Sequence, residues 1–286
     1  MASTGIDPTE FRAGQREAWN GAAGGWEKRQ ELIETAAAHV SERLVELAGI
    51  EEGNRVLDVA AGYGEPSVTV AKAVGPEGTV VATDISSGML EFAKKRAADA
   101  GADNIEFVVV HAGELDFDEA SFDAAVSRWG IIFDPDGEGA AARVRKVLKP
   151  GSRFAIASWA TPDRVPMLAT AMLTAIQHLG VDPPPPGMPG PLSRPTEEAI
   201  TALLEGGGFS DIQVEETEVM TTYDSAEDYA EFIGEIAPPV NALIDPHPEE
   251  VQKETWAAIT EAARKDAGDD GKVTHNNIAL LASGKA

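Results

Sequence analysis

The stretch Val56–Ser67, VLDVAAGYGEPS, decides how this chain folds. An apolar run ends at Asp58, and the small residues AAGYG form a turn before a helical pattern begins at Glu65. Small or missing side chains let a ligand come close to the backbone of such a turn, and the start of the following helix faces the same point. The stretch therefore predicts a buried strand, a ligand-binding turn and a helix.

An acidic residue ends the next apolar run. Thr79–Ala82 (TVVA) leads into Asp84, about 20 residues after Gly64. This separation places a carboxylate at the end of the neighbouring strand, where it can bind both hydroxyls of a ribose. Together the two stretches predict a site for a nucleotide-like ligand.

Strand and helix patterns alternate over about a hundred residues around this turn. Such alternation predicts right-handed crossovers and a parallel, doubly wound α/β sheet, which binds ligands beyond the carboxyl ends of its strands. Two further strands are expected, at Asp211–Tyr223 and Ile278–Ser283. The expected strands before them are residues 54–58, 79–82, 105–110, 122–126 and 153–159.

The chain is expected to have three parts. Residues 1–50 form an N-terminal helical arm or cap, residues 51–160 the ligand-binding core, and residues 161–286 the rest of the sheet. The third part contains an acidic helical segment, about 225–270, whose length exceeds an ordinary hairpin connection. We expect this segment to be an inserted lid.

Two tryptophans stand in the N-terminal part. Trp19 and Trp26 flank the glycine-rich stretch NGAAGG, ahead of a helical pattern over Leu32–Ile50. A mobile aromatic arm that closes over the ligand is one interpretation, and packing of both side chains in the core is the other.

Composition excludes several functions. The chain carries 23 Lys and Arg against 48 Asp and Glu, a formal net charge of −25, so nucleic acid is a poor partner. It has no cysteine, which excludes thiolate metal sites and thiol nucleophiles, and its histidines lack metal-site spacing, so we expect no metal. Neither a signal-peptide pattern nor an apolar run of membrane length occurs, and we expect a cytoplasmic protein with no membrane span. The oligomeric state is left open.

Two classes of cofactor use a turn of this geometry. A dinucleotide site has the pattern G-x-G-x-x-G, whereas this chain has Gly62, Gly64 and then Ser67. A dinucleotide would also place its pyrophosphate against Glu65, an anion facing an anion. Asp58 and Glu65 favour a cationic ligand, and S-adenosylmethionine, with its sulfonium and amino group, is such a ligand.

Four landmarks follow one another between Val56 and Trp159. They are VLDVAAGYG, VVATDISSGML, the segment before FDAAVSRWG, and VLKPGSRFAIASW. In this order they resemble the class I S-adenosylmethionine-dependent methyltransferases, in the branch of the ubiquinone/menaquinone-biosynthesis C-methyltransferases. The resemblance implies a Rossmann-like sheet, mostly parallel with its last strand antiparallel. It also implies S-adenosylmethionine as cofactor and a small-molecule methyl acceptor, such as a quinol, a phenol or a natural-product intermediate.

The resemblance also assigns cofactor contacts by position. Asp58 and the turn after it would surround the methionine end of the cofactor. Asp84 would bind the ribose, Met89 would pack on the adenine, and the backbone N–H of Ala112 would face the adenine ring. The implied contacts are Asp58, Ala60, Gly62, Tyr63, Gly64, Asp84, Ile85, Met89, His111, Ala112, Gly113, Ser127 and Arg128.

Two positions depart from the family pattern. Ala60 replaces the first family glycine, which adds only a methyl group. His111 stands where the family usually has Asp or Asn. A neutral imidazole can still accept a hydrogen bond from the adenine amino group, so an adenine contact and a plain surface histidine both remain open for His111.

No catalytic residue follows from the sequence. Methyl transfer from a sulfonium needs alignment and exclusion of water more than it needs an acid or a base. If the acceptor must lose a proton, candidate bases are His178, His247 and Tyr63. The alternative functions are an NAD(P)-dependent oxidoreductase on the same sheet and a cofactor-binding regulator without turnover.

Overall fold

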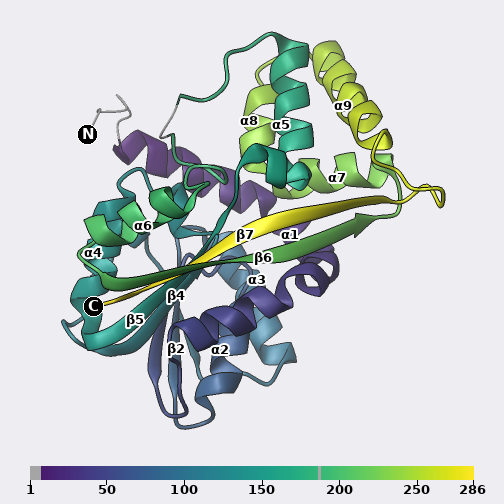
Figure 1. Ribbon diagram of the computed structural model, residues 1–286. Helices are drawn as coiled ribbons and strands as arrows, with labels where there is room; N and C mark the ends of the chain where they lie inside the picture. The colour runs from purple at the N-terminus through teal and green to yellow at the C-terminus, as the bar shows by residue number, and fades with distance from the viewer. Residues whose placement is uncertain (1–7, 186–187) are drawn as a thin grey trace.

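The computed structural model describes residues 8–185 and 188–286, in which one seven-stranded sheet has the order β3-β2-β1-β4-β5-β7-β6 (Figure 1). Strands β1 to β5 are parallel, and β7 pairs antiparallel with both β5 and β6. The expected mostly parallel sheet with its last strand antiparallel is confirmed. The strands are β1 (Arg55–Val59), β2 (Thr79–Asp84), β3 (Ile105–Val109), β4 (Phe122–Arg128), β5 (Leu148–Trp159), β6 (Ser210–Tyr223) and β7 (Val273–Lys285).

Helices cover the sheet and extend beyond one end of it. Figure 1 shows α5, α7, α8 and α9 grouped together at one end of the molecule, beside β6 and β7. The helices are α1 (Pro8–Leu47), α2 (Ser67–Val74), α3 (Ser87–Asp99), α4 (Gly137–Val147), α5 (Pro166–Leu179), α6 (Glu197–Gly206), α7 (Ala226–Ile236), α8 (Pro238–Ile244) and α9 (Glu249–Arg264). Three short 3-10 turns span Ala112–Glu114, Ile131–Phe133 and Pro162–Arg164.

The centre of the sheet is the core of the molecule. Strands β1 and β4 lie side by side, with Val56 opposite Ala124 and Leu57 opposite Ala125, and all four side chains are fully buried. Central strands of a sheet covered on both faces consist of continuous apolar runs, as these do. This rigid centre fixes the strand ends at which the expected ligand site lies.

Helix α1 is longer than the sequence pattern indicated. It runs without a break through the glycine-rich stretch, and the helical pattern recognised in the sequence covers only its second half. Glycine weakens an isolated helix, but packing against α7 requires it here. A β-carbon on Gly25 would lie 2.2 Å from the carbonyl oxygen of Glu235. Close contact between two helices, which no local pattern reveals, therefore explains Gly25.

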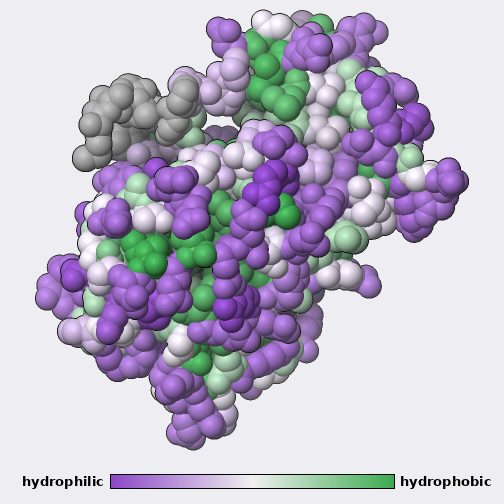
Figure 2. Space-filling model, viewed as in Figure 1, coloured by the Kyte–Doolittle hydropathy of each residue, from purple (hydrophilic) through white to green (hydrophobic). Residues whose placement is uncertain are grey.

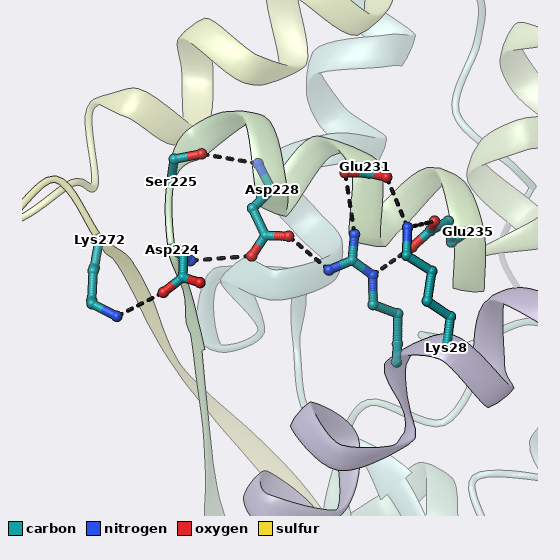
Figure 3. A network of polar contacts seen from close by, with 8 residues as sticks. Lys28, Asp224, Ser225, Asp228, Glu231, Glu235 and Lys272 are labelled. Carbon is teal, nitrogen blue, oxygen red and sulfur yellow. Dashed lines mark hydrogen bonds and ion pairs between the residues drawn. The ribbon is translucent and has the colours of Figure 1, made fainter.

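Ion pairs reinforce the contact between α1 and α7. Figure 3 shows Lys28 directed at Glu231 and Glu235, and the amine lies 2.8 Å from the carboxylate of Glu231. Arg29 lies 2.7 Å from Asp228 on the same helix. The N-terminal helix is therefore bound to the segment that was expected to be a lid.

Helices α7 to α9 lie between β6 and β7 in the chain, within the acidic segment expected at about 225–270. The division into parts 1–50, 51–160 and 161–286 stays a prediction, and residues 1–7 of the first part lie outside the described residues. In the described residues, no helix has both the length and the apolar character that a bilayer crossing requires. The surface in this view is mostly hydrophilic, with an apolar patch over α5 (Figure 2).

Candidate functional site

One cavity opens at the carboxyl ends of β1, β2, β4 and β5, where ligands of doubly wound sheets bind. Helix α1 borders it, together with α5, α7 and α8. We distinguish two sides. The turn side consists of Ala60, Gly62, Tyr63, Glu65, Asp84, Ile85, Met89, His111, Ala112, Arg128 and Asp134. The apolar side consists of Trp129, Trp159, Met167, Leu168, Met172, Val219, Thr221, Phe232, Ile236 and Val240.

The turn after β1 has an unusual backbone. Ala60 and Gly62 both have positive φ angles, of 58° and 55°. A β-carbon on Gly62 would meet nothing within 4 Å, so the backbone here faces open space. Gly130 leaves room for the methyl group of Ala60, because a β-carbon on Gly130 would lie 2.4 Å from that of Ala60. Such a bare backbone lets a ligand approach closely.

Asp84 braces this turn. Its Oδ2 accepts a hydrogen bond of 2.8 Å from the backbone N–H of Gly62, and its Oδ1 accepts one of 2.8 Å from Ser86. The residue is 7% exposed, and burial raises the pKa of its carboxyl to about 6. Each carboxylate oxygen keeps a further lone pair, and Asp84 lines the cavity. The N-cap of α3 is Ser86, one residue before the Ser87 that begins the helix.

Asp58 lies behind the cavity and does not line it. It is fully buried, its Oδ2 accepts a hydrogen bond from the Ser67 hydroxyl, and its Oδ1 has no partner among the described residues. Burial raises the pKa of the Asp58 carboxyl to about 7. An ionised carboxylate in this place is destabilising for the protein without ligand.

We therefore expect Asp58→Asn to raise the free energy of unfolding at about pH 8 by roughly 1–2 kcal/mol. The folded wild type binds the Asp58 proton more tightly than the unfolded chain, whose ordinary pKa is 3.8. Its stability therefore falls as the pH rises from about 4 to about 7, whereas the amide does not titrate. Urea unfolding of both proteins at about pH 5 and pH 8 measures the difference. If the free energies of unfolding of the two proteins differ by the same amount at both pH values, ionisation of Asp58 is not the cause.

A buried ionic cluster joins α1 to the turn side. The Arg128 guanidinium lies 2.7 Å from Oε1 of Glu34 and 2.9 Å from the hydroxyl of Ser41, and the Tyr63 hydroxyl donates to Glu34. Burial opposes ionisation of Glu34, but the charge of Arg128 outweighs it and holds the pKa of this carboxyl below its usual value. The sequence did not reveal Glu34 and Ser41 as partners of Arg128, because both look like ordinary residues on a helix surface.

Tyr63 was one of three candidate bases. Burial raises the pKa of its hydroxyl, and its proton already binds Glu34, so Tyr63 is a poor base. The other two candidates, His178 and His247, do not line the cavity. Of the three candidates, Tyr63 alone lines the cavity, and its hydroxyl already donates to Glu34.

His111 lies beside Asp134, which was not among the expected cofactor contacts. Its Nδ1 accepts a hydrogen bond of 3.0 Å from the backbone N–H of Gly113, and its Nε2 lies 3.3 Å from Oδ2 of Asp134. Burial lowers the pKa of His111 and raises the pKa of Asp134. His111 is 8% exposed, which rules out the plain surface histidine.

The apolar side is built around two tryptophans. The rings of Trp129 and Trp159 are stacked, with centroids 4.3 Å apart and planes 6° from parallel. Trp129 has a φ of 56°, an unusual conformation for a residue with a side chain. Within residues 8–185 and 188–286, no titratable side chain belongs to the apolar side. Neither tryptophan was singled out from the sequence, where both resemble ordinary strand-end core residues.

The structure brings most of the expected cofactor contacts together. Ser127 instead supports the turn from behind, because its hydroxyl donates to the carbonyl of Val59. Gly64 packs against α3, where its β-carbon would lie 3.1 Å from the Cα of Ala93. The expected residues that line the cavity are Ala60, Gly62, Tyr63, Asp84, Ile85, Met89, His111, Ala112 and Arg128, and those that do not are Asp58, Gly64, Gly113 and Ser127.

Comparisons with known proteins bear on this site. A sequence model of the ubiE/COQ5 methyltransferase family matches residues 38–176. Ubiquinone/menaquinone biosynthesis C-methyltransferase UbiE of Pseudomonas fluorescens (strain SBW25) is 39% identical over 124 residues, which cover 43% of this chain and 48% of that protein. The chain thus spans about half the length of the curated UbiE relatives that it matches.

A second relative is matched over most of its length. Aklanonic acid methyltransferase DauC of Streptomyces sp. (strain C5) is 32% identical over 179 residues, covering 59% of this chain and 80% of that protein. Among solved structures, the YcgJ protein of Bacillus subtilis has a TM-score of 0.58 at 20% identity, covering 87% of this chain and 98% of that one, a likeness of fold alone. The resemblance carried by the four landmarks is confirmed.

Proposed function

The chain belongs to the class I S-adenosylmethionine-dependent methyltransferases, in the ubiE/COQ5-like branch, and from this premise we propose that it transfers a methyl group from S-adenosylmethionine to a small apolar acceptor. A quinol, a phenol or another ring-containing natural-product intermediate suits the site. One observation carries the proposal: a single cavity joins a polar, carboxylate-bearing side to an apolar side built on two stacked tryptophans.

The turn side fits the cofactor. Open space beside Gly62 leaves room for a ligand against the backbone, and Asp84 offers two carboxylate oxygens to the hydroxyls of a ribose. Met89 and Ala112 line the part of the cavity where the adenine would lie. In the described residues, three carboxylates, those of Glu65, Asp84 and Asp134, line this side against the single guanidinium of Arg128, and this balance favours a sulfonium over a diphosphate.

The apolar side fits the acceptor. A flat ring system can pack on the Trp129 and Trp159 pair, and neighbouring methionines such as Met167 and Met172 adapt to irregular shapes. By their names, one curated relative is a C-methyltransferase of ubiquinone/menaquinone biosynthesis and the other is an aklanonic acid methyltransferase. We infer that this chain also takes a largely apolar acceptor.

The chain itself contributes orientation and exclusion of water. S-adenosylmethionine, when bound, supplies an activated methyl group on a positively charged sulfur. Asp84 and the turn hold the cofactor, and the apolar side holds the acceptor in line with it. The residues of the apolar side offer no base for a proton of the acceptor, and the titratable groups that line the cavity belong to the turn side.

A binding and turnover experiment tests the function. Calorimetry of the full chain is expected to show binding of S-adenosylhomocysteine and none of NAD(P)H. Incubation with S-adenosylmethionine and a panel of quinols and phenols is expected to yield a methylated product and S-adenosylhomocysteine. Binding of NAD(P)H alone would favour an oxidoreductase, and tight binding of the methyl donor without any product would favour a regulator.

We expect Trp129→Ala to lower kcat/KM for the acceptor by about tenfold and to leave the affinity for S-adenosylhomocysteine within about twofold. The substitution removes the face on which the acceptor packs while leaving the turn side intact. Leu173→Ala is a matched control, because Leu173 is 55% exposed on α5 and lies outside the cavity lining. An equal loss of cofactor affinity in the Trp129 variant would show that the tryptophan supports the cofactor side instead.

A further inference from the structure

A histidine is buried in the two-stranded ribbon that carries the acidic segment. Figure 1 shows β6 and β7 running past the other strands to reach α7 and α9. His275 lies in this part of β7, opposite Thr221 of β6 and before the residues of β7 that also pair with β5. It is 2% exposed, and neither of its ring nitrogens has a hydrogen-bond partner in the described residues. A buried polar ring without partners is costly and needs an explanation.

Two tyrosines enclose this histidine. The ring centroid of His275 lies 5.8 Å from that of Tyr223 on β6 and 5.0 Å from that of Tyr229 on α7. The two tyrosine rings lie 5.2 Å from each other, and both side chains are fully buried. We call these three residues the ring cluster. A charge on the imidazole would lose its hydration here and gain no aligned hydrogen bond from the described residues in exchange.

Few charges act on the ring cluster. Oδ2 of Asp266, which follows α9, lies 3.4 Å from Nε2 of His275, but the Asp266 side chain is 47% exposed and water screens its charge. Arg29 and Asp228, which act on Tyr223, form an ion pair with each other at 2.7 Å. Burial raises the pKa of both tyrosines, which therefore stay neutral. Burial also lowers the pKa of His275 and outweighs the attraction of Asp266, so the closed cluster favours the neutral ring.

The ring cluster supports two residues of the apolar side of the cavity. The hydroxyl of Tyr229 donates to the carbonyl of Met167, at the start of α5, at 2.9 Å. The ring of Tyr223 lies 5.1 Å from that of Phe232 on α7. Met167 and Phe232 both line the cavity. The cluster therefore lies behind the surface on which the acceptor is proposed to pack, and it joins α5 and α7 to the ribbon.

We propose that His275 is a proton-sensitive joint, whose protonation opens the ring cluster and loosens α5 and α7 beside the apolar side. Opening lets the charged ring reach water, which the closed cluster denies it. Because closing lowers the pKa of His275, the closed state is fully favoured above the ordinary value of 6.5 and loses stability as the pH falls below it. The consequence for the acceptor rests on the proposed function, whereas the joint itself does not.

Hydrogen exchange of the full chain, followed by mass spectrometry, tests the joint without any substrate. The protection of amides in α5 and α7, corrected for the intrinsic exchange rate, is compared between about pH 5.5 and about pH 7.5. Amides of β1 and β4 serve as the reference within the same molecule. One unit below the ordinary pKa of histidine, the wild type is expected to lose about five- to tenfold of this protection relative to the reference.

Two replacements remove the titrating ring. His275→Phe keeps an aromatic ring in the cluster, and His275→Leu is a smaller alternative if the larger ring does not fit. In each variant, the protection is expected to be equal at both pH values within about twofold, whatever its absolute level. His178→Phe is the matched control, since His178 is exposed on α5, and it should keep the wild-type loss. Each comparison is made within one protein, so a general change of stability does not imitate the result.

The outcomes distinguish this inference from the proposed function. Equal protection at both pH values in the wild type would overturn the joint, and so would a loss that persists in both His275 variants. If protection instead rises at about pH 5.5 and Asp266→Asn abolishes the rise, Asp266 holds the charged ring in place and the proposal is wrong. If the joint behaves as expected but the chain binds no S-adenosylhomocysteine, the proposed function fails alone.

Discussion

Replacing Asp84 with alanine is expected to weaken binding of S-adenosylhomocysteine about 100-fold, or by roughly 2.7 kcal/mol. The carboxylate accepts the Gly62 N–H at 2.8 Å and so fixes the backbone that faces the cavity. In the proposed complex it also accepts both ribose hydroxyls, and hydrogen bonds to a charged group are stronger than neutral ones. Calorimetry of the variant and the wild type measures the loss.

Two measurements identify the origin of that loss. If Asp84 binds the ribose, an analogue of S-adenosylhomocysteine without the two ribose hydroxyls should bind the wild type weakly. The Asp84→Ala substitution should then weaken binding of this analogue only a little further. The affinity of the wild type should also fall as the pH drops below about 6, because burial raises the pKa of the Asp84 carboxyl to that value and protonation removes its charge. Glu91→Ala, on the exposed face of α3, should change neither result.

The local patterns predicted the sheet well. The expected strand at Asp211–Tyr223 is β6, which begins one residue earlier, and the small-residue turn lies where β1 ends. These features follow from short-range rules, because an apolar run needs burial and a glycine turn needs positive φ angles. The expected strand at Ile278–Ser283 captures only the second half of β7, since the first half alternates polar residues and pairs with β6 alone, whereas the second half also pairs with β5.

Features that depend on contacts between distant residues could not be predicted. Gly25 reads as a helix breaker until the carbonyl of Glu235 is seen against it. At the candidate site, by contrast, Asp84 and the small-residue turn were expected from their spacing, and both line the cavity. Asp134 and the Trp129–Trp159 pair were not predicted, because loops and strands far apart in sequence bring them to one cavity.

The ionic cluster on α1 has a structural consequence of its own. Arg128 reaches from the end of β4 to Glu34, Ser41 and the carbonyl of Ala37, so one buried guanidinium connects the central sheet to the N-terminal helix. Tyr63 shares the same carboxylate from the turn side. The helix that borders the cavity is thus attached to the same residues that shape it, and loss of the cluster should affect both stability and cofactor binding.

Arg128→Met is expected to lower the free energy of unfolding by roughly 3–5 kcal/mol, the largest effect of any single substitution proposed for this chain. Methionine keeps much of the side-chain volume, so the loss arises from the Glu34 carboxylate, which stays buried without its partner at 2.7 Å and keeps only the more distant Arg96, at 4.0 Å, as a cation. Urea unfolding followed by circular dichroism measures it. Arg164→Met is the matched control: Arg164 pairs with Glu216 at the surface, at 2.7 Å and 41% exposure, and its loss should cost less than about 1 kcal/mol.

A double variant shows whether the buried charge is responsible. If the Arg128→Met defect comes from an uncompensated carboxylate, adding Glu34→Gln should recover a large part of the lost stability, since the remaining group is neutral. A defect that Glu34→Gln deepens instead would mean that packing of the guanidinium, and not pairing of its charge, holds α1 on the sheet. In that case Arg128 would lower the pKa of Glu34 by less than the 2.7 Å separation of the two groups implies.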